Sequence, residues 1–399
     1  MKSKITNIKS IFTYDLDSDS IINLDNKELL IDNGVIVDID DKISYDKNII
    51  DANGYTLTPG FIDCHTHPVF IGNRANEFQM RCSGKNYQDI ANQGGGINSS
   101  VKSLRSAEYA DLYNSTIYNI KQLISNGSTT IESKSGYGLS VKDEIKSVKI
   151  INEINNSIDA NIIPTFMGAH AFPSEYADDH CSYIDLICKQ MIPEIKKQNL
   201  SSFCDVFCED GYFDINQTKK ILKNAIKYGM KIKIHVDEFV DIGGINLAVE
   251  MGAISVDHLM NSNNHSIDIL SKSDIVGVLL PGTSFCLGGK KYANGRSMID
   301  SGCKIALATD FNAGSCTITS LPFVMLLSML HCGLTIDETI VGVTYNAAKA
   351  LSIENEVGII KEGYKADILF WDIDKLIEIP YWFGQKRLKK IMINGRVLN

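Results

Sequence analysis

The middle of this chain repeats one alternation: a short apolar run, then a longer amphipathic stretch. Eight apolar runs between Gly60 and about Ala350 follow this pattern. Short apolar runs separated by helix-like segments are typical of parallel strands with crossover helices. Eight such units over about 290 residues predict an α/β chain whose middle folds as a (β/α)8, TIM-like barrel. The runs end near His67, Lys134, His170, Glu209, His235, His258, Pro281 and Asp310.

The two ends of the chain have a different character, with short strand-like runs separated by polar turns. In the C-terminal part, Asn394-Gly395 indicates a hairpin turn. We therefore predict a small β-sandwich domain built from residues 1–59 and 351–399, with the barrel of residues 60–350 inserted between them. The strand-like runs are residues 8–12, 28–37, 42–45, 366–371 and 391–397, and the predicted barrel helices include residues 110–125, 141–155, 217–228, 243–251 and 265–273.

The charge balance and the lack of export or membrane signals limit the classes of partner and the cellular compartment to be expected. The chain has 39 Lys+Arg against 48 Asp+Glu, a net charge of -9, which disfavours non-specific nucleic-acid binding. No apolar run approaches the length of a membrane span, and no secretory signal follows Met1. The ten cysteines form no Cys-x-x-Cys pair, as in proteins of a reducing cytosol. We expect a cytoplasmic protein with a small-molecule partner. The sequence leaves the oligomeric state open, with a homodimer as one candidate because two-fold dimers are the commonest oligomers.

Asp63-Cys64-His65-Thr66-His67 places two histidines one residue apart at the end of an apolar run. Side chains alternate along a strand, so both imidazoles face the same side. His235 and Asp310 end two other runs, and the carboxyl ends of barrel strands meet at one rim. A single histidine at a strand end is more often a hydrogen-bonded structural residue, but four such residues on one rim favour a metal site. Imidazole and carboxylate ligands suit Zn2+ and Fe2+ alike.

Three polar side chains of this cluster are candidates for proton transfer. Asp310 is the best candidate base for an attacking water, since a zinc ion lowers the pKa of water to about 7. Glu238, three residues past His235, could carry a proton, and His258 could polarise a carbonyl. The ordinary alternatives are a helix cap or a solvated acid for Glu238 and a packing residue for His258.

Loops that leave other apolar runs have the residue types of a ligand pocket. Arg74 can clamp a carboxylate with its forked donors, and the glycines around Tyr137 suit a tight loop that presents the ring. Gly94-Gly95-Gly96 predicts a flexible loop that could act as a lid. Taken singly, each candidate has a structural alternative as a surface arginine, a packed tyrosine or a structural histidine. The candidates for ligand binding are Arg74, Tyr137, His170, Asn312, Gly314 and Ser315.

These motifs resemble those of the amidohydrolase superfamily and, within it, of the imidazolonepropionase family. The resemblance runs through most of the chain. Its most specific elements are Lys134-Ser-Gly-Tyr-Gly138 and Gly168-Ala-His170, whereas the whole superfamily shares the metal pattern. The matching segments are residues 58–67, 72–78, 94–97, 132–138, 164–170, 205–209 and 308–312.

The resemblance implies a set of site residues. Many two-metal relatives carry a bridging carboxylated lysine, which has no clear equivalent here, because the resemblance places Lys134 in a substrate loop. The implied ligands of one divalent metal ion, Zn2+ or Fe2+, are His65, His67, His235 and Asp310. The implied substrate-binding residues are Arg74, Tyr137, His170 and Glu238, with Asn312, Gly314 and Ser315 at the propionate or formimino end.

The implied activity is hydrolysis of the cyclic amide bond of 4-imidazolone-5-propanoate to N-formimino-L-glutamate, the third step of histidine degradation. Asp310, His258 and Glu238 would be its catalytic residues. A deaminase of a cyclic amidine or purine would use the same metal ligands, although Arg74 and Tyr137 suit a carboxylate tail that purines lack. A catalytically inactive barrel used for binding is a third interpretation, but such a protein is expected to have lost metal ligands that this chain keeps.

Overall fold

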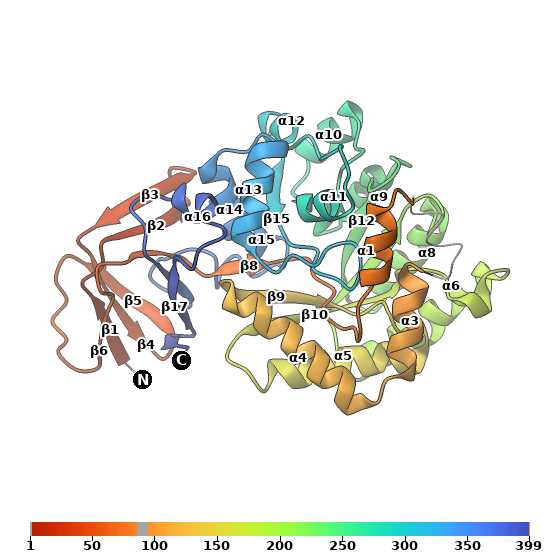
Figure 1. The fold of residues 1–399 in the computed structure, drawn as a ribbon, viewed down its shortest axis with the longest axis horizontal. Helices are drawn as coiled ribbons and strands as arrows, with labels where there is room; N and C mark the ends of the chain where they lie inside the picture. Colours follow the sequence, from red (N-terminus) through yellow and green to blue (C-terminus); the bar gives the residue numbers. More distant parts are fainter. Residues whose placement is uncertain (1, 86–94, 399) are drawn as a thin grey trace.

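The computed structural model describes residues 2–85 and 95–398 (Figure 1). Its largest sheet has eight strands, and each strand is hydrogen-bonded to its neighbour in the order of the sequence. All seven strand pairs in this sheet are parallel. The predicted barrel strands are thereby confirmed. They are β8 (Phe61–Asp63), β9 (Ser128–Lys134), β10 (Asn161–Ala169), β11 (Phe203–Cys208), β12 (Lys231–Val236), β13 (Ser255–His258), β14 (Val276–Leu279) and β15 (Lys304–Leu307).

The barrel closes where the segment after β8 meets the segment after β15. Thr66 and Phe311 form a parallel bridge. The Asp310 amide donates to the His65 carbonyl at 3.0 Å, and the His67 amide donates to the Phe311 carbonyl at 2.8 Å. The seam therefore runs through the residues that the sequence singled out as metal ligands.

A buried carboxylate strengthens the same seam. Asp63 accepts a hydrogen bond from the Thr309 amide at 3.0 Å and from the Thr309 hydroxyl at 2.7 Å. Burial raises the pKa of Asp63 to about 7, although both hydrogen bonds act in the opposite direction. The Asp63 side chain thus links the first barrel strand to the segment after the last one, and it accepts from both the amide and the hydroxyl of Thr309.

Helices cover the outside of the barrel, and their ends follow local capping chemistry. The Ser140 hydroxyl accepts from the Asp143 amide at the start of α5, and Asp214 with Gln217 forms a capping box at the start of α8. Helix α8 buries Ile221, Leu222 and Ala225 and packs on β11 and β12. The helices predicted from the sequence are α4 (Tyr109–Ser125), α5 (Val141–Asn155), α8 (Ile215–Lys227), α9 (Gly244–Met251) and α10 (Asn264–Ser271).

The remaining helices were not singled out in the sequence. Several of them are short, which leaves less than three turns for an amphipathic period to show. They are α1 (Ala75–Cys82), α3 (Ile97–Ser106), α6 (His180–Leu186), α7 (Ile192–Lys197), α11 (Pro281–Cys286), α12 (Gly295–Asp300), α13 (Leu321–His331), α14 (Ile336–Val343), α15 (Tyr345–Lys349) and α16 (Glu378–Tyr381).

Two further sheets lie to the left of the barrel in Figure 1, next to the two termini. One has four strands, all from the N-terminal part, and the other has six strands from both chain ends. Strand β7 pairs with β2 from the N-terminal part and with β16 from the C-terminal part. One apolar core joins them, with Ile5, Ile11 and Phe370 fully buried in it. The strands are β1 (Lys2–Thr6), β2 (Ser10–Asp15), β3 (Ser20–Asp25), β4 (Glu28–Asp32), β5 (Val35–Asp40), β6 (Ile49–Asp51), β7 (Thr56–Pro59), β16 (Ile368–Trp371), β17 (Leu388–Ile393) and β18 (Arg396–Val397).

Some strand predictions for this part were wrong in detail. Residues 28–37 form two strands, not one, because Asn33 and Gly34 both have positive φ angles, 49° and 83°, and make a tight hairpin turn. Residues 42–45 form no strand. The predicted turn at Asn394-Gly395 is confirmed between β17 and β18. The predicted glycine-rich loop begins at Gly94, which lies outside the described residues.

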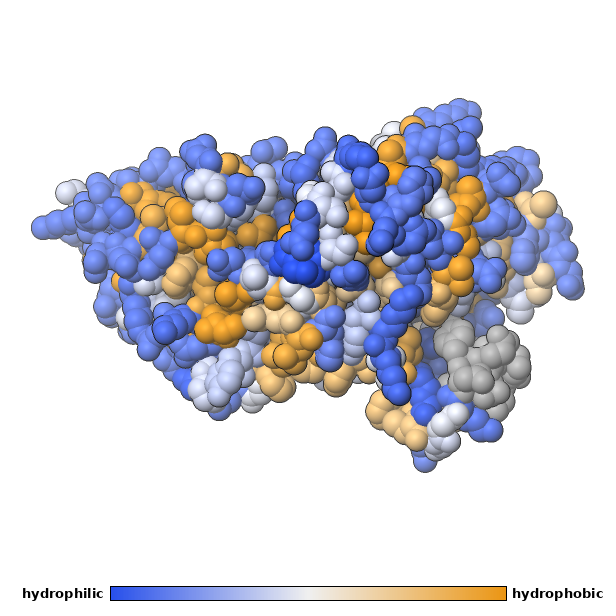
Figure 2. Space-filling model, turned by 90° about the horizontal axis from the view of Figure 1, so that it is seen from above, coloured by the Kyte–Doolittle hydropathy of each residue, from blue (hydrophilic) through white to orange (hydrophobic). Residues whose placement is uncertain are grey.

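Hydrophilic side chains cover much of the face shown in Figure 2, with hydrophobic ones in separate patches between them. Among the described residues, no helix combines the length and the apolar character that crossing a membrane requires.

We predict that Asp63→Ala destabilises the fold by about 1–3 kcal/mol, because it leaves two buried donors of Thr309 without an acceptor. Asp63→Asn should cost much less, since its amide can accept from the Thr309 amide and donate to the Thr309 hydroxyl. Thermal unfolding of the purified variants measures both. Asp268→Ala on α10, where the carboxylate is 55% exposed, serves as control. Equal melting temperatures for Asp63→Ala and the unaltered protein would contradict the role of Asp63 in the seam.

Candidate active site

The predicted ligands His65, His67 and Asp310 lie together at the barrel rim. The Nε2 atoms of His65 and His67 are 3.3 Å apart. Asp310 Oδ1 lies 3.6 Å from His65 Nε2 and 3.5 Å from His67 Nε2. All three side chains are buried, and their ligand atoms lie within 4.8 Å of one another. This spacing is that of atoms that can share one cation.

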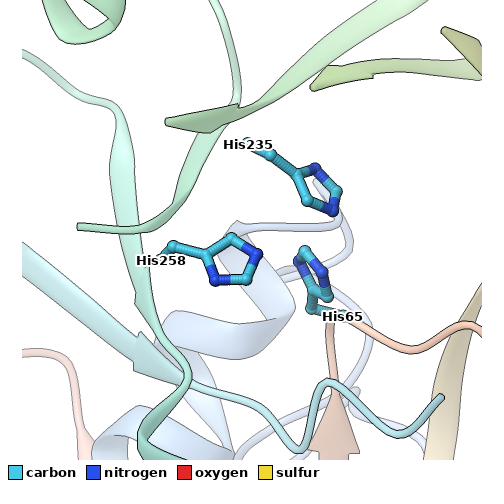
Figure 3. Close-up of side chains that lie close together, drawn as sticks. All are labelled: His65, His235 and His258. Atoms are coloured by element: carbon cyan, nitrogen blue, oxygen red, sulfur yellow. The ribbon is translucent and has the colours of Figure 1, made fainter. Parts of the chain in front are cut away.

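His235 from β12 and His258 from β13 approach the same point. Figure 3 shows the rings of His65, His235 and His258 pointing toward one another. The ring centroids of His65 and His235 are 4.4 Å apart, and those of His235 and His258 are 5.2 Å apart. These three histidines form a second group whose ligand atoms lie within 4.8 Å of one another. The two groups share His65, so the structure brings together all four predicted ligands and His258.

The hydrogen bonds behind two of these rings show that the residues suit a metal ion. His65 Nδ1 lies 2.6 Å from Asp257 Oδ2, and His235 Nδ1 lies 3.0 Å from Asp205 Oδ1. A carboxylate accepts, so each Nδ1 carries the proton and each Nε2 presents a lone pair to the site. His235 Nε2 is buried and has no hydrogen-bond partner among the described residues. A buried lone pair of this kind calls for a cation or a donor.

The electrostatics favour the ligand forms of these groups. Burial, together with the neighbouring Lys134 and histidines, lowers the pKa of His65 well below its ordinary value, and burial does the same for His67. Both rings are thus neutral, as metal ligands must be. Burial raises the pKa of Asp310 to about 6, against hydrogen bonds such as the one that the Thr283 hydroxyl donates to Oδ2.

Unusual backbone conformations aim two of these side chains. His258 and Asp310 have φ angles of 85° and 52°, in the left-handed region that residues other than glycine seldom adopt. Because of this turn, Asp257 contacts His65 inside the barrel while the next residue, His258, reaches the site above. Such strain concentrates at functional sites, since the surrounding structure must maintain it.

A cavity opens directly above the cluster. Besides ligands it is lined by the predicted residues Arg74, Tyr137, His170, Glu238, His258, Asn312 and Ser315. Five further lining residues were not predicted, because single apolar and aromatic side chains carry no sequence signal that separates a cavity wall from ordinary packing. They are Ile97, Phe207, Tyr212, Phe239 and Leu287.

Gly314 does not line this cavity and instead lies against Arg74. A Cβ atom on Gly314 would lie 2.1 Å from Arg74 Cζ, so only glycine leaves room for the guanidinium. Glu77 Oε2 accepts from Arg74 Nε at 2.9 Å and lies 2.8 Å from Nη2, which fixes the plane of the guanidinium. Glu77, missed in the sequence, is thus a positioning residue for Arg74.

The Asn312 side chain organises its own loop. Its Nδ2 donates to the Asp310 carbonyl at 2.7 Å and to Ser315 Oγ at 2.8 Å. Its Oδ1 accepts from the amides of Gly314 and Ser315, each at 2.8 Å. Because these bonds occupy the amide, Asn312 contributes to the cavity mainly by holding the loop in shape.

The loop that presents Tyr137 wraps around one carboxylate. Glu144 Oε1 accepts from the amides of Gly136 at 3.2 Å, Gly138 at 2.8 Å and Leu139 at 2.9 Å. His170 Nδ1 lies 3.0 Å from the Gly136 carbonyl and so donates to it, which leaves its Nε2 as an acceptor. Burial, with His235 nearby, lowers the pKa of His170 to about 3, so this ring is neutral.

Glu238 and His258 face each other across the cavity, with Oε2 and Nε2 3.6 Å apart. Burial, with the charges of Asp310 and Glu209, raises the pKa of Glu238 well above its ordinary value. Burial and His235 lower the pKa of His258. Burial therefore favours the protonated form of Glu238 and the neutral form of His258. Glu209 holds the Glu238 loop, since it accepts from the amides of Phe239 at 2.9 Å and Val240 at 3.0 Å.

Lys134 does not lie in the substrate loop where the resemblance placed it. Its side chain is fully buried inside the barrel, with Nζ 2.6 Å from Asp205 Oδ2 and 2.8 Å from Glu132 Oε2. Burial acts to lower the pKa of Lys134, but Asp205, Glu132 and Asp257 outweigh it and raise the pKa above its ordinary value. The side chain is therefore an ammonium ion, paired and turned away from the cavity.

With this geometry established, comparisons with known proteins identify the family. The model of the amidohydrolase family matches residues 56–398. The imidazolonepropionase of Alkaliphilus metalliredigens is 41% identical over 357 residues, which are 90% of this chain and 85% of the relative. The chain belongs to the imidazolonepropionase family of amidohydrolases. Another member, the imidazolonepropionase of Thermoanaerobacter pseudethanolicus, is 43% identical over 346 residues, 87% of this chain and 83% of the relative.

Solved structures of a hydrolase and two deaminases share the fold of this imidazolonepropionase family member. A triazine hydrolase variant has a TM-score of 0.78 at 15% sequence identity and covers 100% of this chain and 94% of its own. Escherichia coli guanine deaminase has a TM-score of 0.75 at 15% identity and covers 100% of this chain and 99% of its own. An adenosine deaminase from Xanthomonas campestris, solved with bound zinc, has a TM-score of 0.74 at 13% identity, covering 99% and 92%. Identities this low show a common fold alone.

We predict that Glu144→Ala lowers the free energy of unfolding by about 1–3 kcal/mol or more, because three amides of the Tyr137 loop lose their acceptor. Glu144→Gln keeps one acceptor oxygen and should retain most of the stability. Thermal unfolding compares the two variants, and chymotryptic cleavage of the native protein after the buried Tyr137 reports loosening of the loop. If Glu144→Ala melted and resisted chymotrypsin like the unaltered protein, the carboxylate would not be what holds this loop.

Proposed function

We propose that this chain hydrolyses the cyclic amide bond of 4-imidazolone-5-propanoate to N-formimino-L-glutamate, a step of histidine degradation. The observation that carries the proposal is the identity of 41% and 43% with two imidazolonepropionases over 90% and 87% of this chain. The cavity supports it. Arg74 offers a cation for the propionate, and Glu238, His258 and Asp310 offer groups for proton transfer around one point.

His65, His67, His235 and Asp310 would hold one divalent metal ion, Zn2+ or Fe2+. Such an ion, when bound, acidifies water and polarises a carbonyl oxygen. A single ion is favoured because Lys134 is held as an ammonium by Asp205 and Glu132, and a charged ammonium cannot become the carboxylated bridge of two-metal sites. The three neutral imidazoles and one carboxylate form a donor set that both metals accept.

The first proton transfer is assigned to Asp310. Thr283 donates to its Oδ2, which leaves Oδ1 facing His65 and His67 and directed toward the attacking water. A pKa of about 6 lets this carboxylate accept a proton near neutral pH and release it again. As water adds to the ring carbonyl carbon, His258 supplies an N–H group to the developing oxyanion.

The second transfer completes the cleavage of the carbon–nitrogen bond. The departing ring nitrogen needs a proton, and Glu238 lines the cavity with a raised pKa that favours its protonated form. His170 Nε2 is an acceptor and binds a ring N–H group of the substrate. Glu238 is therefore the proposed proton donor, and His170 the proposed substrate-binding residue.

The remaining cavity residues orient the substrate. Arg74, with its plane fixed by Glu77, pairs with the propionate, and Tyr137 closes the cavity beside it. Asn312 and Ser315 shape the wall at the propionate or formimino end, and Gly314 keeps space for Arg74. Holding the remote end of the substrate in this way contributes to orientation at the reacting carbon.

The deaminase alternative receives support from the fold alone, since guanine and adenosine deaminases share the architecture at low identity. A paired arginine at the cavity wall matches a carboxylate-bearing substrate better than a purine. An inactive scaffold is also disfavoured, because the chain keeps every proposed metal ligand and these residues lie close together.

The proposed function is tested by following the ultraviolet absorbance of freshly generated 4-imidazolone-5-propanoate with the purified protein, with and without a chelator. We expect fast loss of absorbance, formation of formiminoglutamate, and inhibition by the chelator that Zn2+ or Fe2+ reverses. Stable absorbance in the presence of metal-loaded protein would refute the proposal. Ammonia release from guanine or a cyclic amidine would then support the deaminase.

We predict that Arg74→Met raises KM for this substrate about 10–100-fold, since a charge-assisted hydrogen bond contributes about 1.5–3 kcal/mol. The bound metal content should not change, because Arg74 is not one of the proposed ligands. Arg296→Met on α12, where the arginine pairs with Asp300 and Glu338 outside the cavity, is the matched control. Steady-state kinetics and metal analysis measure both variants. An unchanged KM in Arg74→Met would exclude the pairing with the propionate.

A further inference from the structure

A layer of charged side chains fills the barrel interior directly beneath the histidines. Barrel interiors are usually packed with branched apolar residues, so this layer departs from the common pattern. The side chains in it have 0% exposure. They come from four strands and comprise Glu132 and Lys134 on β9, Asp205 on β11, Lys233 on β12 and Asp257 on β13.

The two lysines connect the three carboxylates. Lys134 Nζ lies 2.6 Å from Asp205 Oδ2, 2.8 Å from Glu132 Oε2 and 4.0 Å from Asp257 Oδ2. Lys233 Nζ lies 3.1 Å from Glu132 Oε1 and 3.9 Å from Asp257 Oδ2, and it donates to the Cys64 carbonyl at 2.9 Å. Glu132 is thus held by both ammonium groups, and Asp257 lies within 4.0 Å of both.

Stability does not account for this arrangement. Buried ion pairs lose solvation that their mutual attraction only partly returns, and apolar residues of similar volume are often as stable or more so. Two charged groups in the layer have a second contact that points to another role. Asp205 accepts from His235, and Asp257 accepts from His65. Both are proposed metal ligands, from β12 and from the segment after β8.

We propose that Lys134 and Lys233 are positioning residues for the metal centre, which lock Asp205 and Asp257 in the orientations that direct the Nε2 lone pairs of His235 and His65 into one site. Lys134 holds the oxygen of Asp205 that is not used by His235, so the carboxylate cannot rotate without losing an ion pair. Lys233 also fixes the backbone before His65 through the Cys64 carbonyl. The inference rests on the metal site of the proposed function.

The direction in which the metal affinity changes on removal of a lysine distinguishes positioning from electrostatic repulsion alone. Removing a lysine near a cation site removes a repulsion, so Coulomb's law alone predicts tighter metal binding. Loss of positioning predicts weaker binding, because a ring free to turn or to change tautomer no longer presents its lone pair. Partners behind metal ligands typically contribute 10–100-fold in affinity.

The experiment measures the affinity of the metal-depleted full-length chain for Zn2+ by competition with a chromophoric chelator, in the absence of substrate. Lys134→Met and Lys233→Met are each expected to bind Zn2+ about 10–100-fold more weakly. The visible spectrum of the Co2+-loaded variants should also change, since it reports the ligand geometry. Lys4→Met is the matched control, because Lys4 is a buried lysine paired with Glu28 at 3.2 Å in the small β domain. It should lower the melting temperature and leave Zn2+ affinity unchanged.

Lys134→Met leaves excess negative charge buried in the barrel and could fail to fold for that reason. A second variant tests the inference in that case. Glu132→Gln combined with Lys134→Met removes one charge of each sign, so the net charge of the layer is unchanged. Weakened Zn2+ binding in this double variant, relative to Glu132→Gln alone, supports positioning. Zn2+ affinity equal to that of Glu132→Gln would overturn it.

The remaining outcomes separate this inference from the proposed function. Unchanged or tighter Zn2+ binding in folded Lys134→Met and Lys233→Met would overturn the inference while leaving the hydrolase in place. If the lysine variants bind Zn2+ more weakly as expected but the unaltered, metal-loaded protein does not hydrolyse the imidazolone, the inference is supported and the proposed substrate is refuted. An unaltered chain that binds neither Zn2+ nor Fe2+ would overturn both.

Discussion

The seam that closes the barrel is the interaction on which the rest of the structure depends. Two backbone hydrogen bonds, from Asp310 to the His65 carbonyl and from His67 to the Phe311 carbonyl, join the first and last strands. The same bonds set the separation of the ligand atoms of His65, His67 and Asp310. A barrel that failed to close would therefore lose its site, and a displaced site would open the barrel. Fold and metal binding are coupled through one short stretch of backbone.

Periodicity was sufficient to predict the barrel and its rim from the sequence. Eight apolar runs, seven of them ending near a polar residue, identified the strands of the barrel, and the helix predicted at residues 141–155 matches α5. The four metal-type residues and the cavity residues Arg74, Tyr137 and His170 could be predicted because strand ends in such barrels meet at one rim. The roles of these residues stay predictions until they are measured.

The supporting residues could not be predicted, because their partners are distant in the sequence. Asp257 is adjacent to His258 yet contacts His65, and only the positive φ angle of His258 makes this geometry available. Lys134 and Lys233 do carry a signal, since each stands two residues from another polar residue, Glu132 or His235, on the same face of its strand. That alternation indicates a polar interior face, but it does not reveal which carboxylate meets which lysine. The need for glycine at position 314 likewise follows only from the position of the Arg74 guanidinium, which the sequence does not reveal.

The way in which the two chain ends share a sheet has a consequence for how the protein is made. Strand β7 leads through Gly60 directly into β8, the first barrel strand, and its antiparallel partner β16 lies roughly 310 residues further along the chain. On a ribosome, the edge of β7 that β16 covers therefore stays unpaired while the whole barrel between these two strands is synthesised. Contacts of such long sequence separation form late and slow folding. The sheet that supports the barrel seam is thus completed by strands that leave the ribosome only after the barrel itself.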